Sequence, residues 1–102
     1  MFAFPDDACW NDDEDAVEFG IRLGDYEGRV FLPRRVLQSL IGVRPKAEDC
    51  LAHFHLNRTA FERIAEERVR ARHLDDDANI RITGRDLRAF RRSSGSNSGQ
   101  ES

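Results

Sequence analysis

The chain has 102 residues, of which 34% are charged and 39% hydrophobic, and its formal net charge is −3. This length supports one small domain with a modest core and excludes a second domain. No stretch approaches the ~20 consecutive apolar residues of a membrane span, and residues 1–7 lack the basic and apolar regions of a secretory signal. Cys9 and Cys50 are too few and too far apart for a disulfide framework or a zinc site. We therefore expect a cytoplasmic protein that does not associate with membranes.

Charge is unevenly distributed along the chain. Residues 1–28 contain nine acidic residues and one basic residue, whereas residues 81–92 contain five arginines and one acidic residue. Because the chain as a whole is acidic, its composition does not indicate a general nucleic-acid binder.

The first third of the chain predicts a small antiparallel sheet. Apolar and polar residues alternate strictly over residues 17–23, which is typical of a half-buried strand. Residues 24–28 have turn chemistry, and residues 29–32 are expected to return as the second strand of a hairpin. Residues 2–4 form a candidate edge strand that ends at Pro5.

The middle of the chain predicts helices. Pro33 suits the first position of a helix and Gly42 the position just after its end, so a short amphipathic helix is expected between them. Residues 47–72 contain neither glycine nor proline and carry an apolar stripe at helical spacing. We predict one long helix here, with a break near Asn57 as the alternative, because asparagine can cap a second helix.

The last part predicts a loop, a strand and a short helix. Residues 75–79 form the polar loop, and Ile80 and Ile82 alternate with Arg81 as a third main strand. The Thr83-x-x-Asp86 spacing resembles a capping box that opens the helix.

These elements define an α+β class: a small antiparallel sheet of three to four strands, one long helix packed on one face, and short helices. The predicted domain spans residues 1–92. Residues 93–102 are rich in serine and glycine and have no apolar side chain, so they are expected to be a disordered tail.

The order of several short motifs resembles that of a known family. An N-terminal Phe-Pro-Asp is followed by a tryptophan and a Val-x-Phe strand, and three further motifs come later: Val36-Leu37, Phe54-x-x-Asn57-Arg58-x-x-Phe61-x-x-Ile64-Ala65 and Ile80-x-Ile82-Thr83-x-x-Asp86-Leu87. Over about residues 2–90 the chain is similar to the bacterial domain-of-unknown-function family numbered 1488. The resemblance implies a small α+β domain and no assigned activity. Pro33 departs from the serine or threonine cap expected there, which affects only the local cap.

A metal site at Cys50, His53 and His55 is not expected. Cys50 and His53 are one helical turn apart, but His55 lies about 200° further round the helix than His53, so the three cannot converge. Cys50 falls in the apolar stripe, where a free cysteine behaves as a small hydrophobic residue. No third group would orient a Cys–His nucleophile pair either.

The acidic loop resembles a calcium-binding loop in part. Asp75, Asp77 and Asn79 match its first three ligand positions, and Asp86 matches the twelfth. Ile80 occupies the position that requires glycine, however, and the twelfth position requires a bidentate glutamate. A solvated polar turn is the better interpretation, so no metal or other cofactor is predicted.

Asn57 and Arg58 form a polar pair on the apolar stripe of the predicted long helix. They must be paired or exposed, because burying an unpaired charge costs several kcal/mol. The preferred interpretation is that Arg58 binds a carboxylate of the acidic N-terminal segment, with Asp6 and Asp7 as candidates; the alternative is a pocket in which Arg58 receives an anion. Trp10 is expected to cover one end of the core, with an exposed partner anchor as the alternative.

The sequence favours a non-catalytic protein-interaction or accessory module with an unknown protein partner. No set of general base, nucleophile and electrostatic stabiliser can be assembled, so an enzyme is not predicted. The alternative function is a small nucleic-acid-associated regulator, which depends on Arg85, Arg88 and Arg92, spaced along one face of the last helix.

Overall fold

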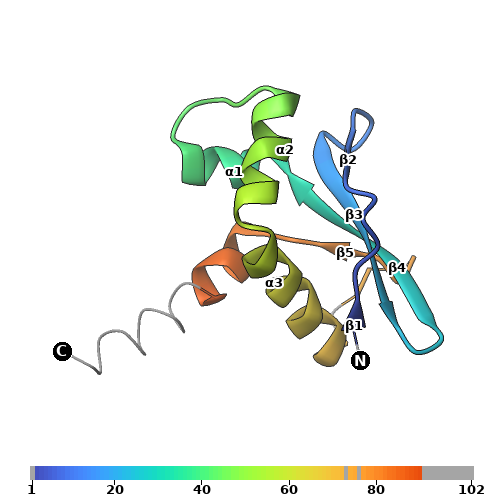
Figure 1. The fold of residues 1–102 in the computed structure, drawn as a ribbon. Helices are drawn as coiled ribbons and strands as arrows, with labels where there is room; N and C mark the ends of the chain where they lie inside the picture. Colours follow the sequence, from blue (N-terminus) through green and yellow to red (C-terminus); the bar gives the residue numbers. More distant parts are fainter. Residues whose placement is uncertain (1, 73, 76, 91–102) are drawn as a thin grey trace.

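The computed structural model describes residues 2–72, 74–75 and 77–90, in which helices cover one face of a five-stranded sheet (Figure 1). The strands are β1 (Phe2–Ala3), β2 (Cys9–Asn11), β3 (Ala16–Leu23), β4 (Tyr26–Pro33) and β5 (Ile80–Arg81). The helices are α1 (Arg34–Ile41), α2 (Ala47–Leu56) and α3 (Arg58–Arg70), and residues 84–90 are also helical. The predicted α+β class is therefore confirmed. The predicted tail, residues 93–102, lies outside the described residues.

The β3–β4 hairpin is the centre of the sheet, as its alternating pattern predicted. The two strands pair antiparallel over their whole length, from Ala16 opposite Pro33 to Leu23 opposite Tyr26. β1 and β2 both pair with the other edge of β3. The inward-facing side chains of β3 and β4 are buried beneath the helices, among them Val17, Phe19, Ile21, Val30 and Leu32.

The sheet is mixed, so the prediction of a purely antiparallel sheet is wrong. β5 runs parallel to β4, with Ile80 opposite Val30, and the Ile82 N–H donates to the Phe31 carbonyl at 2.9 Å. A parallel neighbour requires a crossover connection, which α1 to α3 supply. Because these helices return the chain to the end of the sheet where β4 began, β5 must run in the same direction as β4.

The predicted single long helix is two helices that meet at Asn57. Asn57 has φ −121° and ψ 27°, outside the helical region, and its side-chain nitrogen donates to the His53 carbonyl at 3.1 Å. Asn57 is the C-cap residue of α2 and also the N-cap residue of α3, whose first N–H groups, of Ala60 and Phe61, donate to its carbonyl at 3.0 and 3.3 Å. Its side chain makes no capping bond to α3, because it is turned back to the α2 carbonyl. Phe54 and Phe61 flank this break and stack with ring centroids 6.0 Å apart, which holds both helices on one core.

The end of α1 at Gly42 follows the predicted pattern, but Pro33, predicted as the first helical residue, is extended and ends β4, so α1 begins at Arg34. The sequence also did not indicate how the first turn of α1 is satisfied. Gly42 ends the helix with φ +95° and donates its N–H to the Gln38 carbonyl at 2.8 Å, as expected for a C-terminal glycine. Pro33 offers no capping side chain; instead, the Arg34 N–H donates to the Asp15 carbonyl at 2.9 Å. The cap expected from serine or threonine is thus replaced by a tertiary contact from the turn before β3.

The predicted polar loop and capping box are both confirmed. The Asp75 carboxylate accepts the N–H groups of Asp77 and Asn79 at 3.0 and 2.8 Å, which shapes a tight turn before β5. Thr83 and Asp86 exchange reciprocal bonds of 2.9 and 3.1 Å between backbone N–H and side-chain oxygen.

Ala78 adopts a left-handed conformation, φ +63°, in the turn before β5. A non-glycine residue is strained there. Ala78→Gly relieves this strain but also raises the conformational entropy of the unfolded chain. We expect a net stabilisation of roughly 0.5 kcal/mol in urea denaturation. The matched control is Ala52→Gly on the exposed side of α2, which should cost about 1 kcal/mol because glycine is a poor helix former. A loss of stability at Ala78 comparable to that at Ala52 would contradict the strain.

Candidate functional site

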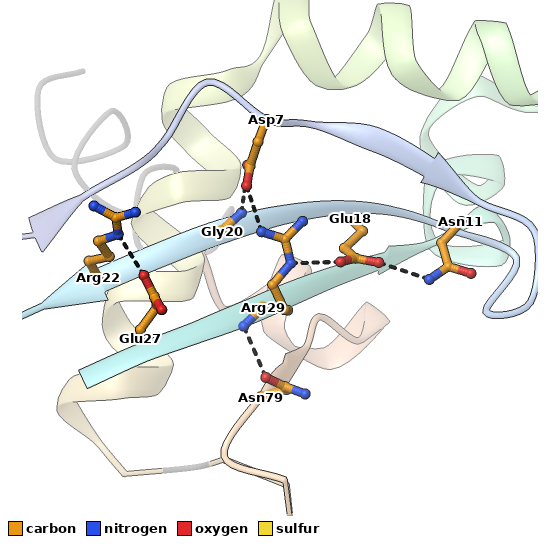
Figure 2. A network of polar contacts seen from close by, with 8 residues as sticks. All are labelled: Asp7, Asn11, Glu18, Gly20, Arg22, Glu27, Arg29 and Asn79. Atoms are coloured by element: carbon orange, nitrogen blue, oxygen red, sulfur yellow. Dashed lines mark hydrogen bonds and ion pairs between the residues drawn. The ribbon is translucent and has the colours of Figure 1, made fainter. Parts of the chain in front are cut away.

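The face of the sheet opposite the helices carries charged side chains in fixed pairs. We call this surface the outer face, and it is formed by the residues of β3, β4 and β5 that alternate with the core: Glu18, Gly20, Arg22, Glu27, Arg29, Phe31 and Arg81. The segment between β1 and β2 reaches this surface through Asp7 (Figure 2).

Arg29 is the centre of the outer face. Its Nε donates to Glu18 at 2.6 Å and its Nη1 to Asp7 at 2.6 Å, and Asn11 donates to the second oxygen of Glu18 at 2.8 Å (Figure 2). The hydrogen bond from Arg29 holds the pKa of Asp7 below its usual value. Asn11, followed by Arg29, lowers the pKa of Glu18. Both carboxylates are therefore stabilised in their charged form.

Two main-chain donors beside Arg29 are satisfied by side chains instead of by neighbouring strands. The Gly20 N–H donates to Asp7 at 3.0 Å in the gap between β1 and β2, and the Arg29 N–H donates to the Asn79 side-chain oxygen at 2.9 Å beyond the start of β5. A Cβ on Gly20 would lie only 2.8 Å from Nη1 of Arg29. Glycine at this position lets the Asp7–Arg29 pair sit directly on the sheet.

A cleft of about 370 Å³ opens on this surface. Pro5 and Asp7 line it on one side and Asn79 on the other, above the backbone of β3 and β4. Arg22 and Glu27 also line it and pair with each other at 2.8 Å (Figure 2). The cleft is at the small end of the range of ligand-binding pockets. Its lining offers both signs of charge at fixed positions, which suits recognition of a charged side chain.

The third arginine of the outer face is also paired. Arg81 forms an ion pair with Glu14, and its guanidinium lies 5.4 Å from the ring centroid of Phe31. Each arginine of the outer face thus has at least one carboxylate partner.

Arg58 does contact the N-terminal segment, but its shorter contact is local. Its Nε donates to Glu62, one turn along α3, at 2.7 Å, and its Nη1 lies 3.3 Å from Asp6. Asp7, the other candidate partner, binds Arg29 instead. Asp6 therefore contacts the helices, whereas the adjacent Asp7 contacts the outer face. The exposed side chain of Asn57 bonds only to His53 of α2, so it does not belong to the outer face.

Trp10 is half-buried against the core and is covered from outside. Its indole N–H donates to Asp12 at 2.6 Å, and the Arg34 guanidinium lies 4.9 Å from its ring. Arg34 also binds Asp15 at 3.0 Å and the Pro45 carbonyl at 2.9 Å. Trp10 therefore has the structural position expected at one end of the core.

The arginines of the last helix are only partly described. Arg85 and Arg88 are exposed and make no ion pair with any other described residue, whereas Arg92 lies outside the described residues. Asp86, between them, binds Arg68 on α3 at 2.6 Å.

The residues considered for metal binding have other roles. Cys50 is buried in the core, where burial raises the pKa of its thiol, and Asp75 is engaged by backbone N–H groups. Within residues 2–72, 74–75 and 77–90, no three His, Cys, Asp or Glu side chains are grouped so that they could hold a metal ion.

The sequence did not indicate the cluster of Asp7, Glu18, Arg29 and Asn79. The charges that alternate with the apolar residues of β3 indicated a polar face. That pattern could not indicate that Asp7 and Asn79 would lie on this face, because both come from loops.

Arg58→Ala is expected to lower the free energy of unfolding by about 1–3 kcal/mol. The change removes two charged hydrogen bonds, leaves the largely buried Glu62 unpaired, and removes the packing of the side-chain stem. Arg58→Met keeps the stem and should recover part of the loss in urea denaturation. Arg63→Ala, on the exposed side of the same helix, is the control and should change stability by less than about 0.5 kcal/mol. A neutral Arg58→Ala would reject the structural role.

Stability should fall with acid partly because of Asp7 and Glu18. Both have folded-state pKa values below their usual range, so their contribution is present above about pH 5 and is lost as pH falls through the folded pKa values, because the unfolded chain binds protons first. Thermal melts between pH 6 and pH 3 should show a smaller loss of stability for Asp7→Asn than for the wild type. Equal slopes would show that the Asp7 pair contributes no pH dependence.

Together, the architecture and the outer face define a small α+β domain with helices on one side of a mixed sheet and a surface of paired charges on the other. The family model described as "Protein of unknown function (DUF1488)" matches residues 3–82, most of the chain, and the protein belongs to this family.

A solved structure supports the same fold. The chain is similar to a protein of unknown function from the DUF1488 family of Shewanella loihica PV-4, with a TM-score of 0.73 and 20% identity over 79% of this chain and 90% of that one. At this identity the likeness shows the fold alone. A search of curated protein sequences returns no match. Among the described residues, no helix has the length and apolar character needed to cross a bilayer.

Proposed function

We propose that this protein is a non-catalytic interaction module that binds a partner protein through the outer face of its sheet. The observation that carries the proposal is the pre-ordered set of charged pairs around the cleft, with Arg29 held by Asp7 and Glu18, and Arg22 held by Glu27. Side chains that are already fixed lose little conformational entropy when a partner binds.

The buried face of the sheet supports the proposal that the outer face is free for binding. The large buried side chains of β3 and β4 pack against the helices, so the outer face is not needed to complete the core. The proposed setting is the bacterial cytoplasm, where the unpaired thiols of Cys9 and Cys50 would remain reduced.

The test is affinity capture with two matched double variants. Arg22→Ala with Glu27→Ala removes one exposed ion pair from the outer face, and Arg70→Ala with Glu67→Ala removes the contacts of Arg70 with Glu66 and Glu67 from α3; neither changes the net charge. A nuclease-treated native lysate should yield a stoichiometric protein with the wild type and the α3 variant, and at least about fivefold less of it with the outer-face variant. Equal capture by both variants would refute the proposal, provided both melt like the wild type.

A nucleic-acid-associated function is the second candidate, because Arg85 and Arg88 are exposed and unpaired within the described part of the chain. It requires binding that weakens steeply with salt and is reduced by Arg88→Ala. Fluorescence polarisation with a labelled 20-base-pair duplex at two salt concentrations tests it. Submicromolar, salt-dependent binding would make this the leading function, whereas we expect nothing tighter than ~10 μM at physiological ionic strength.

A further inference from the structure

We propose that the outer face docks a basic segment of the partner protein, with one arginine or lysine side chain entering the cleft between Asp7 and Glu27. The inference rests on the proposed function and adds the chemistry of the partner. It is carried by three features of the described residues: the way the cleft arginines are already paired, the charge around the cleft, and the blocked edges of the sheet.

The cleft arginines are already bound by carboxylates, so an incoming anion would have to displace one of them. Arg29 binds both Asp7 and Glu18, and Arg22 binds Glu27. An incoming cation needs no such exchange, because each carboxylate oxygen accepts more than one hydrogen bond. The side chain of Glu27 is 69% exposed, and its Oε2 lies 2.8 Å from Nε of Arg22. So exposed a carboxylate can accept a further donor from the solvent side.

The charges that line the cleft balance, with Asp7 and Glu27 against Arg22 and Arg29, so the charge of the surrounding segment decides which sign of ligand is attracted. Residues 2–33, which form β1 to β4, contain nine acidic residues and two arginines, a net charge of −7, whereas residues 34–90 have a net charge of +3. Asp12, Asp13 and Asp25, at the two ends of β3, make no ion pair with any other described residue. A field of this sign attracts a basic segment and repels an acidic one.

The edges of the sheet are poorly suited to an added strand, which makes the outer face the docking surface. Beyond β5, the Arg68 side chain donates to the Arg81 carbonyl at 2.9 Å, and Asp75 accepts the Asn79 N–H at 2.8 Å. At the opposite edge, β1 and β2 are only two and three residues long, and Asp7 fills the gap between them by binding the Gly20 N–H of β3. Side chains at β5 and short, interrupted strands at the other edge thus hinder the addition of a strand, and a partner segment is directed to the cleft.

The experiment uses two fluorescein-labelled dodecapeptides, one alternating arginine with serine and one alternating glutamate with serine, in anisotropy titrations of the full chain. The arginine peptide should bind, and its affinity should fall at least about fivefold between 50 and 200 mM NaCl. Glu27→Gln should weaken it about fivefold. Glu67→Gln is the matched control, because Glu67 is 72% exposed and pairs with one arginine, as Glu27 does; it should change the affinity less than twofold. Amide shifts in the wild type should concentrate at Gly20, Arg22 and Gly28.

Several results would overturn the inference: equal weakening by both variants, equal or tighter binding of the glutamate peptide, shifts centred away from the cleft, or no binding at about 1 mM protein. Thermal melts of both variants establish that they are folded. If the capture experiment depends on Arg22 and Glu27 but the arginine peptide does not bind, this inference fails and the interaction module stands. If capture is independent of the outer face, the proposed function itself fails.

Discussion

Phe54→Ala is expected to lower the free energy of unfolding by about 3–5 kcal/mol. The ring is fully buried and packs against Phe19 and Phe61, with centroids 4.8 and 6.0 Å away. Its removal leaves a cavity between β3 and both main helices, which meet at Asn57 and cannot close over it without moving. Urea denaturation followed by circular dichroism measures the loss, and Phe54→Leu should lie between the wild type and Phe54→Ala.

The control for this change is two residues away on the same helix. The Leu56 side chain is 83% exposed, so Leu56→Ala should alter stability by less than about 0.5 kcal/mol. Since small domains have only about 5–15 kcal/mol of total stability, Phe54→Ala should also lower the melting temperature markedly. Similar effects at the two positions would mean that α2 presents a different face to the sheet.

Arg29→Ala is expected to lower the free energy of unfolding by about 2–3 kcal/mol, because it leaves the largely buried Glu18 and the more exposed Asp7 without their cation on one surface. It also removes one of the two contacts, the other being the Gly20 N–H, that hold Asp7 and the segment between β1 and β2 against the sheet. Urea denaturation at pH 7 provides the measurement. Arg29→Lys should recover only part of the loss, since an ammonium group cannot reproduce the two-directional guanidinium contact.

Arg22→Ala is the control for Arg29→Ala. The Arg22–Glu27 pair is more than half exposed on both sides, so its loss should cost less than about 1 kcal/mol. A double-mutant cycle with Asp7→Ala should give a coupling energy near 1 kcal/mol for the Asp7–Arg29 contact. Zero coupling, with Arg29→Ala no worse than Arg22→Ala, would show that the cluster does not anchor the N-terminal segment.

Local patterns predicted the elements whose geometry depends on near neighbours in the chain. The β3–β4 hairpin followed from period-two alternation, since successive strand side chains point to opposite faces. Gly42 predicted the end of α1 because its φ of +95° costs glycine little. Thr83 and Asp86 predicted the start of the last helix because a capping box is complete within four residues.

The candidate site could be predicted only in part, because its contacts join distant segments. Glu18 and Arg29 lie on the alternating polar side of the hairpin, so a polar face was readable. Asp7 and Asn79 are 22 and 50 residues from Arg29 in the chain. Each lies in a loop, and the sequence pattern of a loop does not predict its path. Likewise, the sequence left Asp6 and Asp7 as alternative partners of Arg58. The path of the loop places Asp6 beside α3 and Asp7 on the sheet.

The sequence by itself determined the α+β class, the central hairpin, the short first helix and the inward residues of the core, because these depend on periodicity and on the backbone preferences of glycine and proline. The tertiary structure alone decided the parallel direction of β5, the division of the long helical stretch at Asn57 and the assembly of the cluster around Arg29. Each of these depends on where the helical crossover and the N-terminal segment pack, and packing is set by contacts between residues far apart in the chain.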